Sequence, residues 1–175
     1  MKIDIARQPL VPAFMTLFAL AVAAMCAGIP VSDTSGAVRD ALPLLGGQLA
    51  RFQAAYPVWS KFAAGFMLLF TGMCAGRITI RYNLYTVGTC LPIPLYAIVA
   101  CGIATGGNYL AGFAASMLLA LATKNYCRAF CNGYGFDAIF RASLYLGLMP
   151  LVYAPGLPML LLLPLVELLL KKKHL

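Results

Sequence analysis

The sequence predicts an all-α protein, a polytopic transmembrane bundle of about six helices that forms a single integral membrane domain over residues 1–175. Of its 175 residues, 62% are hydrophobic and 10% are charged, whereas a soluble domain carries about 25% charged residues. The mean hydropathy is +0.87, and several apolar runs approach the roughly 20 residues that cross a hydrocarbon layer of about 30 Å. Small soluble domains bury only about two-thirds of the surface of their chains, so this much apolar surface indicates that lipid surrounds the protein.

The first helix is expected over residues 10–29, after the basic residues Lys2 and Arg7. Its apolar run is longer than the core of a typical signal peptide, and small residues are poorly placed for a cleavage site. We therefore expect a helix that stays in the mature chain.

The segment that follows, 31–57, is more polar. Leu49, Phe52 and Tyr56 recur there at helical spacing, and an apolar face of this kind suits the headgroup layer of a bilayer. An irregular connection that touches the lipid is the alternative.

Five further helices are expected, joined by short polar or basic connections, over residues 58–76, 84–105, 109–123, 137–154 and 157–170. The last two share an apolar stretch of 29 residues, 142–170, which would be about 43 Å long as one straight helix. Pro155 has no N–H group and Gly156 tolerates a turn, so this stretch is expected to fold into a short hairpin. The hairpin either crosses the bilayer twice or enters and leaves on one side.

The distribution of the 13 Lys and Arg residues sets the expected orientation. With the N-terminus in the cytoplasm and six crossings, ten basic residues lie inside and three lie outside, in agreement with the positive-inside rule. The ten are Lys2, Arg7, Arg77, Arg81, Lys124, Arg128, Arg141, Lys171, Lys172 and Lys173, and the three are Arg39, Arg51 and Lys61. A single crossing of the final stretch would change this ratio to seven against six, so the hairpin is favoured and both ends are expected in the cytoplasm.

Small residues recur every four positions in three of the expected helices. These are Gly72 and Gly76, Gly102 and Gly106, and the series Gly112, Ser116 and Ala120. Small residues at this spacing let helix backbones approach closely in lipid. We interpret them as contacts inside the bundle, with self-association as the alternative.

The sequence carries no signature of catalysis, of a metal site or of a cofactor. Four of the six cysteines lie in apolar runs, where cysteine packs as a small hydrophobic residue. Cys127 and Cys131 are spaced i, i+4, but the only histidine is His174, and two thiols alone fall short of a zinc site. No acidic pair, HExxH segment or Ser/His/Asp set is present. We expect a protein that is not an enzyme.

Five polar or kink positions are candidates for function. Lys61 and Glu167 lie near the ends of expected helices, and ionisable groups at membrane depth often mark transport paths. Glu167 also precedes a lysine by four residues, the spacing of an interfacial ion pair. Pro92 and Pro94 are expected in the middle of a helix, where they either free carbonyl groups for a substrate site or simply kink the helix. Asn108 ends the polar connection before the fourth helix.

The segment NGYGFDAIFRASLYLGLMPLVYAPGLP, followed by LLLKKK, resembles a pattern in uncharacterised multi-pass inner-membrane proteins of Gram-negative bacteria. In those proteins an Asn/aromatic loop leads into a hairpin of two short helices and then into a basic loop. The resemblance covers about the last fifty residues. It implies a location in the bacterial inner (plasma) membrane and further helices after the basic segment LLLKKK.

These features predict a non-enzymatic membrane subunit or scaffold of an envelope complex. Its expected partners are the lipid bilayer and other membrane proteins, with no nucleic acid, because the basic residues lie at the ends of apolar runs. The alternative is a small-solute or lipid transporter with a third helix broken by Pro92 and Pro94. A polar cavity around these prolines and Asn108 would favour transport, and an apolar groove without a cavity would favour the subunit.

Overall fold

The structure is a computed structural model that describes residues 10–26, 44–82, 90–104, 108–132 and 135–173; the side chains of 10–12, 23–26, 101–104, 132, 167 and 169–173 are not described. Every regular element in these ranges is a helix, which confirms the all-α class. The elements are α1 (Leu10–Cys26), α2 (Leu44–Ala55), α3 (Pro57–Arg81), α4 (Pro92–Ala104), α5 (Tyr109–Asn132), α6 (Phe136–Val152), the 3₁₀ helix η2 (Ala154–Leu161) and α7 (Leu162–Lys173).

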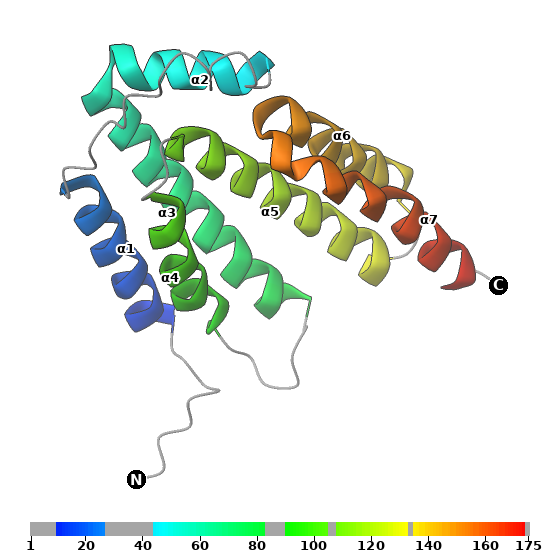
Figure 1. The fold of residues 1–175 in the computed structure, drawn as a ribbon. Coiled ribbons are helices and arrows are strands. Elements are labelled where there is room, and N and C mark those ends of the chain that lie inside the picture. The colour runs from blue at the N-terminus through cyan, green and yellow to red at the C-terminus, as the bar shows by residue number, and fades with distance from the viewer. Residues whose placement is uncertain (1–9, 27–43, 83–89, 105–107, 133–134, 174–175) are drawn as a thin grey trace, which may run out of the picture.

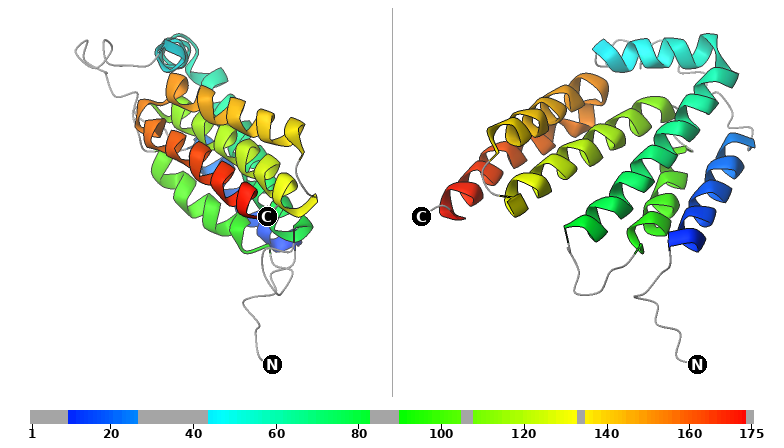
Figure 2. Two further views of the ribbon diagram at one scale, coloured as in Figure 1. Left: turned by 90° about the vertical axis from the view of Figure 1, so that its right-hand side faces the viewer. Right: turned by 180° about the vertical axis from the view of Figure 1, so that it is seen from behind.

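The long elements alternate in direction, and α2 lies across one end of them (Figure 1). Helices α1, α3 and α4 form a group in which each contacts the other two, and α5 packs against α3 on one side and α6 on the other. After α6 the chain turns back, so that η2 and α7 run in the opposite direction to α6 (Figure 2). We call the end that carries α2 the α2 end. The opposite end, where α3, α5 and α7 finish, is called the basic end.

Two large apolar clusters and a smaller one around Ala111, Ala114 and Val152 hold the helices together. The first joins α1, α3, α4 and α5, and its largest fully buried side chains are Leu17, Leu68, Ile93, Leu110 and Phe113. The second joins α5 and α6 around small or medium side chains, with Leu163 and Val166 of α7 packed against it. Because α5 belongs to both large clusters, it connects the two halves of the molecule.

Helix α3 comes close to its neighbours at two of its glycines, Gly72 and Gly76. A Cβ atom on Gly72 would lie 2.6 Å from Cδ2 of Leu17 in α1, and a Cβ atom on Gly76 would lie 2.5 Å from Cδ1 of Ile93 in α4. Both distances are shorter than van der Waals contact, so a larger residue requires movement of the neighbour. The prediction that this glycine pair packs inside the bundle is confirmed.

Two helices continue five or more residues past the ends that the sequence predicted. Helix α3 runs through the expected connection to Arg81, and α5 runs past residue 123 to Asn132. The predicted ends were wrong because each helix was ended just before a basic residue of the expected connection, Arg77 or Lys124, although Arg and Lys are good helix formers. The predicted helix 10–29 begins at Leu10 as expected, and 27–43 lies outside the described residues.

The predicted helix 84–105 corresponds to α4, which begins at Pro92. Pro92 and Pro94 therefore lie in its first turn. The N–H groups of a first turn have no partner within the helix, so a proline there costs no hydrogen bond. The N–H of Ile93 donates to the carbonyl of Cys90 at 3.0 Å and closes the turn that precedes the helix. The prediction of a helix broken in its middle by these prolines is wrong.

The chain reverses between α6 and η2, as the hairpin requires. Helix α6 ends at Val152, and the N–H of Gly156 donates to the carbonyl of Tyr153 at 2.9 Å. The second arm begins as a 3₁₀ helix and not as the expected α-helix. Pro158 lies inside this arm and removes a donor that an α-helical ladder would use. One straight helix over 142–170 is excluded.

The segment after the first helix is helical over the residues of α2, so the helical alternative is confirmed there. Its buried side includes Gly46 and Gln53, whereas Phe52 and Tyr56 are exposed. The predicted apolar face of Leu49, Phe52 and Tyr56 is therefore not the buried side of this segment, and Gln53 is buried because its side chain has a hydrogen-bonding partner on another helix.

Within the described residues, one helix has the length and composition of a membrane span. It is α3, with 25 residues and a mean hydropathy of 1.5 over its most apolar 18-residue window, of which 39% is buried. Two shorter apolar helical stretches are Ala13–Val22 and Ala154–Val166. A buried core helix or a signal sequence also passes this test. The described residues therefore establish an all-helical protein with one candidate membrane span. The described helices do not establish the predicted bundle of six spans.

Candidate functional site

The first turns of α3 and α5 are joined by a buried pair of hydroxyl groups. The side chain of Ser60 is fully buried, and its Oγ lies 2.6 Å from the hydroxyl oxygen of Tyr109. Ser60 Oγ also donates to the carbonyl of Pro57 at 2.8 Å. Because a serine hydroxyl has one hydrogen, Tyr109 is the donor in the pair, and it fixes α5 against α3 at the α2 end.

The side chain of Gln53 connects α2 to the same place. It is 5% exposed, and its Oε1 accepts the N–H of Leu110 at 3.5 Å. The first N–H groups of a helix have no partner within the helix, so Gln53 satisfies one of them for α5. This contact explains why a glutamine is buried on α2.

A second set of hydroxyl groups lies midway along the bundle. The hydroxyl of Tyr96 in α4 lies 3.2 Å from Oγ of Ser116 in α5, and Ser116 donates in turn to the carbonyl of Phe113 at 2.8 Å. The buried hydroxyl of Thr71 in α3 is next to that of Tyr96. Three helices therefore contribute one hydroxyl each, and Ser116 belongs to the small-residue series that the sequence indicated.

The interface of α3 and α5 opens into a pocket at the basic end. Its volume is about 320 Å³, and it is lined by Phe70, Met73, Cys74, Arg77, Ile78, Arg81, Tyr82 and Lys124. All of these except Lys124 belong to the last turns of α3 or directly follow them. The pocket combines an apolar wall with three cations.

None of the three cations forms an ion pair in the described part of the chain. Arg77 and Arg81 are spaced i, i+4 on α3, so they share a face, and like charges at this spacing repel. Lys124 of α5 and Arg77 of α3 both act electrostatically on the thiol of Cys74. Charges from the two helices therefore lie around this thiol. An anion in the pocket would relieve this repulsion.

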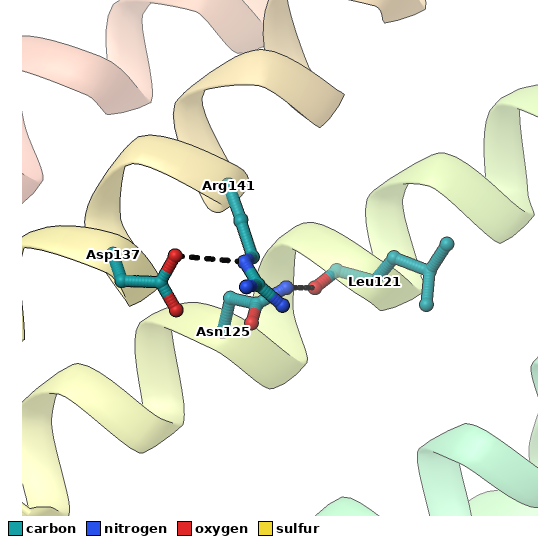
Figure 3. A network of polar contacts seen from close by, with 4 residues as sticks. All are labelled: Leu121, Asn125, Asp137 and Arg141. Carbon is teal, nitrogen blue, oxygen red and sulfur yellow. Dashed lines mark hydrogen bonds and ion pairs between the residues drawn. The ribbon is translucent and has the colours of Figure 1, made fainter.

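The one ion pair among the described side chains lies elsewhere, on α6. Nε of Arg141 donates to Oδ1 of Asp137 at 2.9 Å (Figure 3). On α5, which packs against α6, Nδ2 of Asn125 donates to the carbonyl of Leu121 at 2.9 Å. Asp137 lies in the first turn of α6, and the residue at the N-terminal cap is Gly135, without a side-chain bond. Both charged side chains are exposed, and such pairs contribute about 0.2–1 kcal/mol.

The five candidate positions from the sequence do not form one site. Lys61 is half-buried in the first turn of α3, and Asn108 directly precedes α5, so both lie at the α2 end. Pro92 and Pro94 lie at the basic end, whereas Asn108 follows the other end of α4, about 15–18 Å away along the helix axis. The pocket at the basic end is lined by neither these prolines nor Asn108. The side chain of Glu167 lies outside the described side chains, and so does its predicted ion pair with Lys171.

The cysteines near the end of α5 are free thiols. Cys127 is half-buried and Cys131 is exposed. Burial raises the pKa of the Cys127 thiol, and the nearby Cys131 raises it further. The described side chains contain no group of three or more His, Cys, Asp or Glu residues that suits a metal ion.

Sequence reasoning missed the pocket, although part of its signal was present. If α3 is extended to Arg81, the spacing of Arg77 and Arg81 places two cations on one face. The position of Lys124 beside them depends on the packing of α5 and has no local signal. Comparisons with protein-family models, with curated proteins and with solved structures find no significant match.

Proposed function

We propose that this chain is a polytopic membrane protein with both ends in the cytoplasm, and that it serves as a non-enzymatic subunit or scaffold of a membrane complex. The observation that carries the proposal is the apolar surface that the helices turn outward. Large apolar side chains are exposed on α1, α3, α4, α6 and α7, among them Phe18, Phe66, Ile98, Leu144 and Leu168. Monomeric soluble proteins rarely expose apolar patches above a few hundred Å², so lipid and partner helices are the natural cover for this surface.

The arrangement of charge supports the same proposal. Arg77, Arg81, Lys124, Arg128 and Arg141 belong to helix ends that meet at the basic end, whereas Arg51 and Lys61 lie at the α2 end. Between these levels, residues 62–76, 92–104, 109–123 and 142–152 include no charged residue. With a bilayer between the two levels, the basic end faces the cytoplasm under the positive-inside rule.

The role as a subunit or scaffold is supported by how the buried polar groups are used. The hydroxyl groups of Ser60, Tyr109, Tyr96 and Ser116 bond to one another or to backbone carbonyls. Bonds of this kind hold helices together in lipid. Small residues such as Gly76 serve the same end, since they allow close packing.

Transport of a small solute or a lipid is the second candidate, and the cation-lined pocket favours it. It no longer has the support of a helix broken at Pro92 and Pro94. Reconstitution of the purified chain into vesicles tests this alternative, because a transporter alone in the bilayer gives a flux that the vesicles without protein lack.

The experiment that tests the main proposal begins with isolated membranes that contain the full-length chain. We expect the chain to stay with the membranes in an alkaline carbonate wash, to be released by mild detergent, and to copurify with a companion protein in constant stoichiometry. Release by the wash alone would contradict the membrane location. Purification from the detergent extract without a companion would contradict the subunit role and leave the location unaffected.

A further inference from the structure

The pocket at the basic end lies where an aromatic face of α3 finishes. Trp59, Phe62, Phe66 and Phe70 are separated by three or four residues, so they follow one side of the helix. All four side chains are exposed, Trp59 and Phe66 by 68% each. The rings form two pairs, with centroids 6.4 Å apart for Trp59 and Phe62 and 6.3 Å apart for Phe66 and Phe70.

The aromatic face and the pocket are continuous. Phe70 belongs to both, and Met73, one turn further along α3, is a pocket residue with an exposed side chain. A ligand that fills the pocket with an anionic group therefore meets an apolar path directly beside it. A soluble phosphate compound has no apolar group to place along such a path, whereas the acyl chain of a phospholipid can pack against it.

The dimensions along α3 agree with those of a bilayer. Trp59 and Arg77 are 18 positions apart, about 27 Å along the helix axis, close to the hydrocarbon thickness of about 30 Å. Tryptophan is enriched at both membrane interfaces, and cations are enriched at the cytoplasmic one. Phe62, Phe66 and Phe70 then lie at the depth of the acyl chains, and Arg77 lies at the depth of the phosphates.

We propose that the pocket binds the phosphate of an anionic phospholipid through Arg77, Arg81 and Lys124, with an acyl chain of that lipid along Phe66 and Phe70. Arginine presents a fork of donors that matches phosphate oxygens, and basic pockets on the cytoplasmic side of membrane helices suit anionic headgroups. This inference rests on the membrane location proposed above. The bound lipid would neutralise the two arginines that otherwise repel each other on α3.

The headgroup contact is tested with the purified full-length chain in a non-ionic detergent. Phosphatidylglycerol, phosphatidylcholine, inorganic phosphate and glycerol phosphate are titrated separately, and the unfolding temperature and the bound mass in native mass spectrometry are followed. We expect phosphatidylglycerol alone to bind and to raise the unfolding temperature. The Lys124→Gln and Arg77→Gln variants are each expected to bind it about tenfold more weakly, the effect of one lost charge-assisted hydrogen bond.

Arg128→Gln is the matched control, because Arg128 is an exposed cation one turn further along α5 and does not line the pocket. We expect its affinity for phosphatidylglycerol to be unchanged. Equal weakening by Arg128→Gln and Lys124→Gln would overturn the pocket as the site. An equal response to phosphatidylcholine would overturn the headgroup contact, and an equal response to inorganic phosphate would overturn the lipid as ligand.

The acyl-chain contact has its own pair of variants. Phe66 and Phe70 on α3 and Phe136 and Phe140 on α6 are stacked pairs with the same centroid distance of 6.3 Å. We expect Phe70→Ala to weaken binding of phosphatidylglycerol and Phe140→Ala to leave it unchanged; equal effects would overturn the acyl path. An alkaline wash of membranes with each variant reports the membrane location separately. A wash-resistant chain that does not bind the lipid contradicts this inference alone.

Discussion

Replacement of Gly76 by alanine tests the close contact between α3 and α4. The added Cβ would lie 2.5 Å from both Cγ1 and Cδ1 of Ile93, a residue with no exposed surface. Cγ1 is attached directly to Cβ of Ile93, so rotation of the end of the side chain does not remove the overlap. Overpacking of a core costs about 1–3 kcal/mol, and alanine gains about 0.8–1 kcal/mol over glycine in a helix. We expect the free energy of unfolding to fall by up to about 2 kcal/mol.

Two further glycines separate these contributions. A Cβ on Gly147, on the exposed side of α6, meets no atom within 4 Å, so Gly147→Ala is expected to stabilise the protein by about 1 kcal/mol. A Cβ on Gly72 meets the two terminal methyl groups of Leu17 at 2.6 and 2.9 Å. Because these methyl groups move more easily than Cγ1 of Ile93, Gly72→Ala is expected to lie between the other two variants.

The measurement is thermal unfolding of the purified full-length variants in one detergent, followed by far-UV circular dichroism. The difference between Gly76→Ala and Gly147→Ala isolates the overpacking, since both gain the same helix propensity. In an Ile93→Ala background both overlapping atoms are gone, and Gly76→Ala should then stabilise. A Gly76→Ala protein as stable as Gly147→Ala in the native background would refute the contact between α3 and α4.

Three other outcomes follow from the described contacts. Tyr109→Phe removes the donor to the buried Ser60 hydroxyl and is expected to lower the free energy of unfolding by about 1–2 kcal/mol in the same melts; no change would contradict the hydrogen bond. Asp137→Asn breaks an exposed ion pair and is expected to change that free energy by less than about 1 kcal/mol; a larger loss would indicate a buried role. A maleimide should modify Cys131 before Cys127, measured by mass spectrometry. Burial raises the pKa of the Cys127 thiol, and the reactive form is the thiolate. The rate of Cys127 modification should therefore go on rising at a pH where the rate of an ordinary thiol no longer increases. Equal rates for the two cysteines at neutral pH would contradict the burial of Cys127.

The sequence predicted the helices and their packing better than their ends. Apolar runs and the small residues Gly72 and Gly76 are local signals, and the structure contains the corresponding helix contact. The reversal after Val152 was also predictable, because Pro155 and Gly156 disfavour a continuous helix. In contrast, basic residues such as Arg77 and Lys124 indicate where a chain would leave hydrocarbon, and they do not indicate where a helix ends.

The candidate site was largely unpredictable because its residues are distant in the sequence. Ser60 and Tyr109 are 49 positions apart, and Gln53 and Leu110 are 57 apart. Neither contact follows from periodicity, which reports the burial of a face and not the partner of a hydroxyl or an amide. Pro92 was misread for a related reason, since proline disrupts a helix interior but is well suited to its first turn.

The most direct test of the proposed membrane arrangement uses two cysteines at opposite ends of the molecule. Cys131 is exposed in the last turn of α5 at the basic end, and Gln48 is exposed on α2 at the other end. Each is presented alone, as native Cys131 or as Gln48→Cys, in a full-length chain whose remaining cysteines are replaced by alanine. Both are then treated with a membrane-impermeant maleimide in right-side-out and in inverted vesicles. We predict that Cys131 reacts only in inverted vesicles and Gln48→Cys only in right-side-out vesicles. Reaction of both from the same side would contradict a bilayer between the α2 end and the basic end.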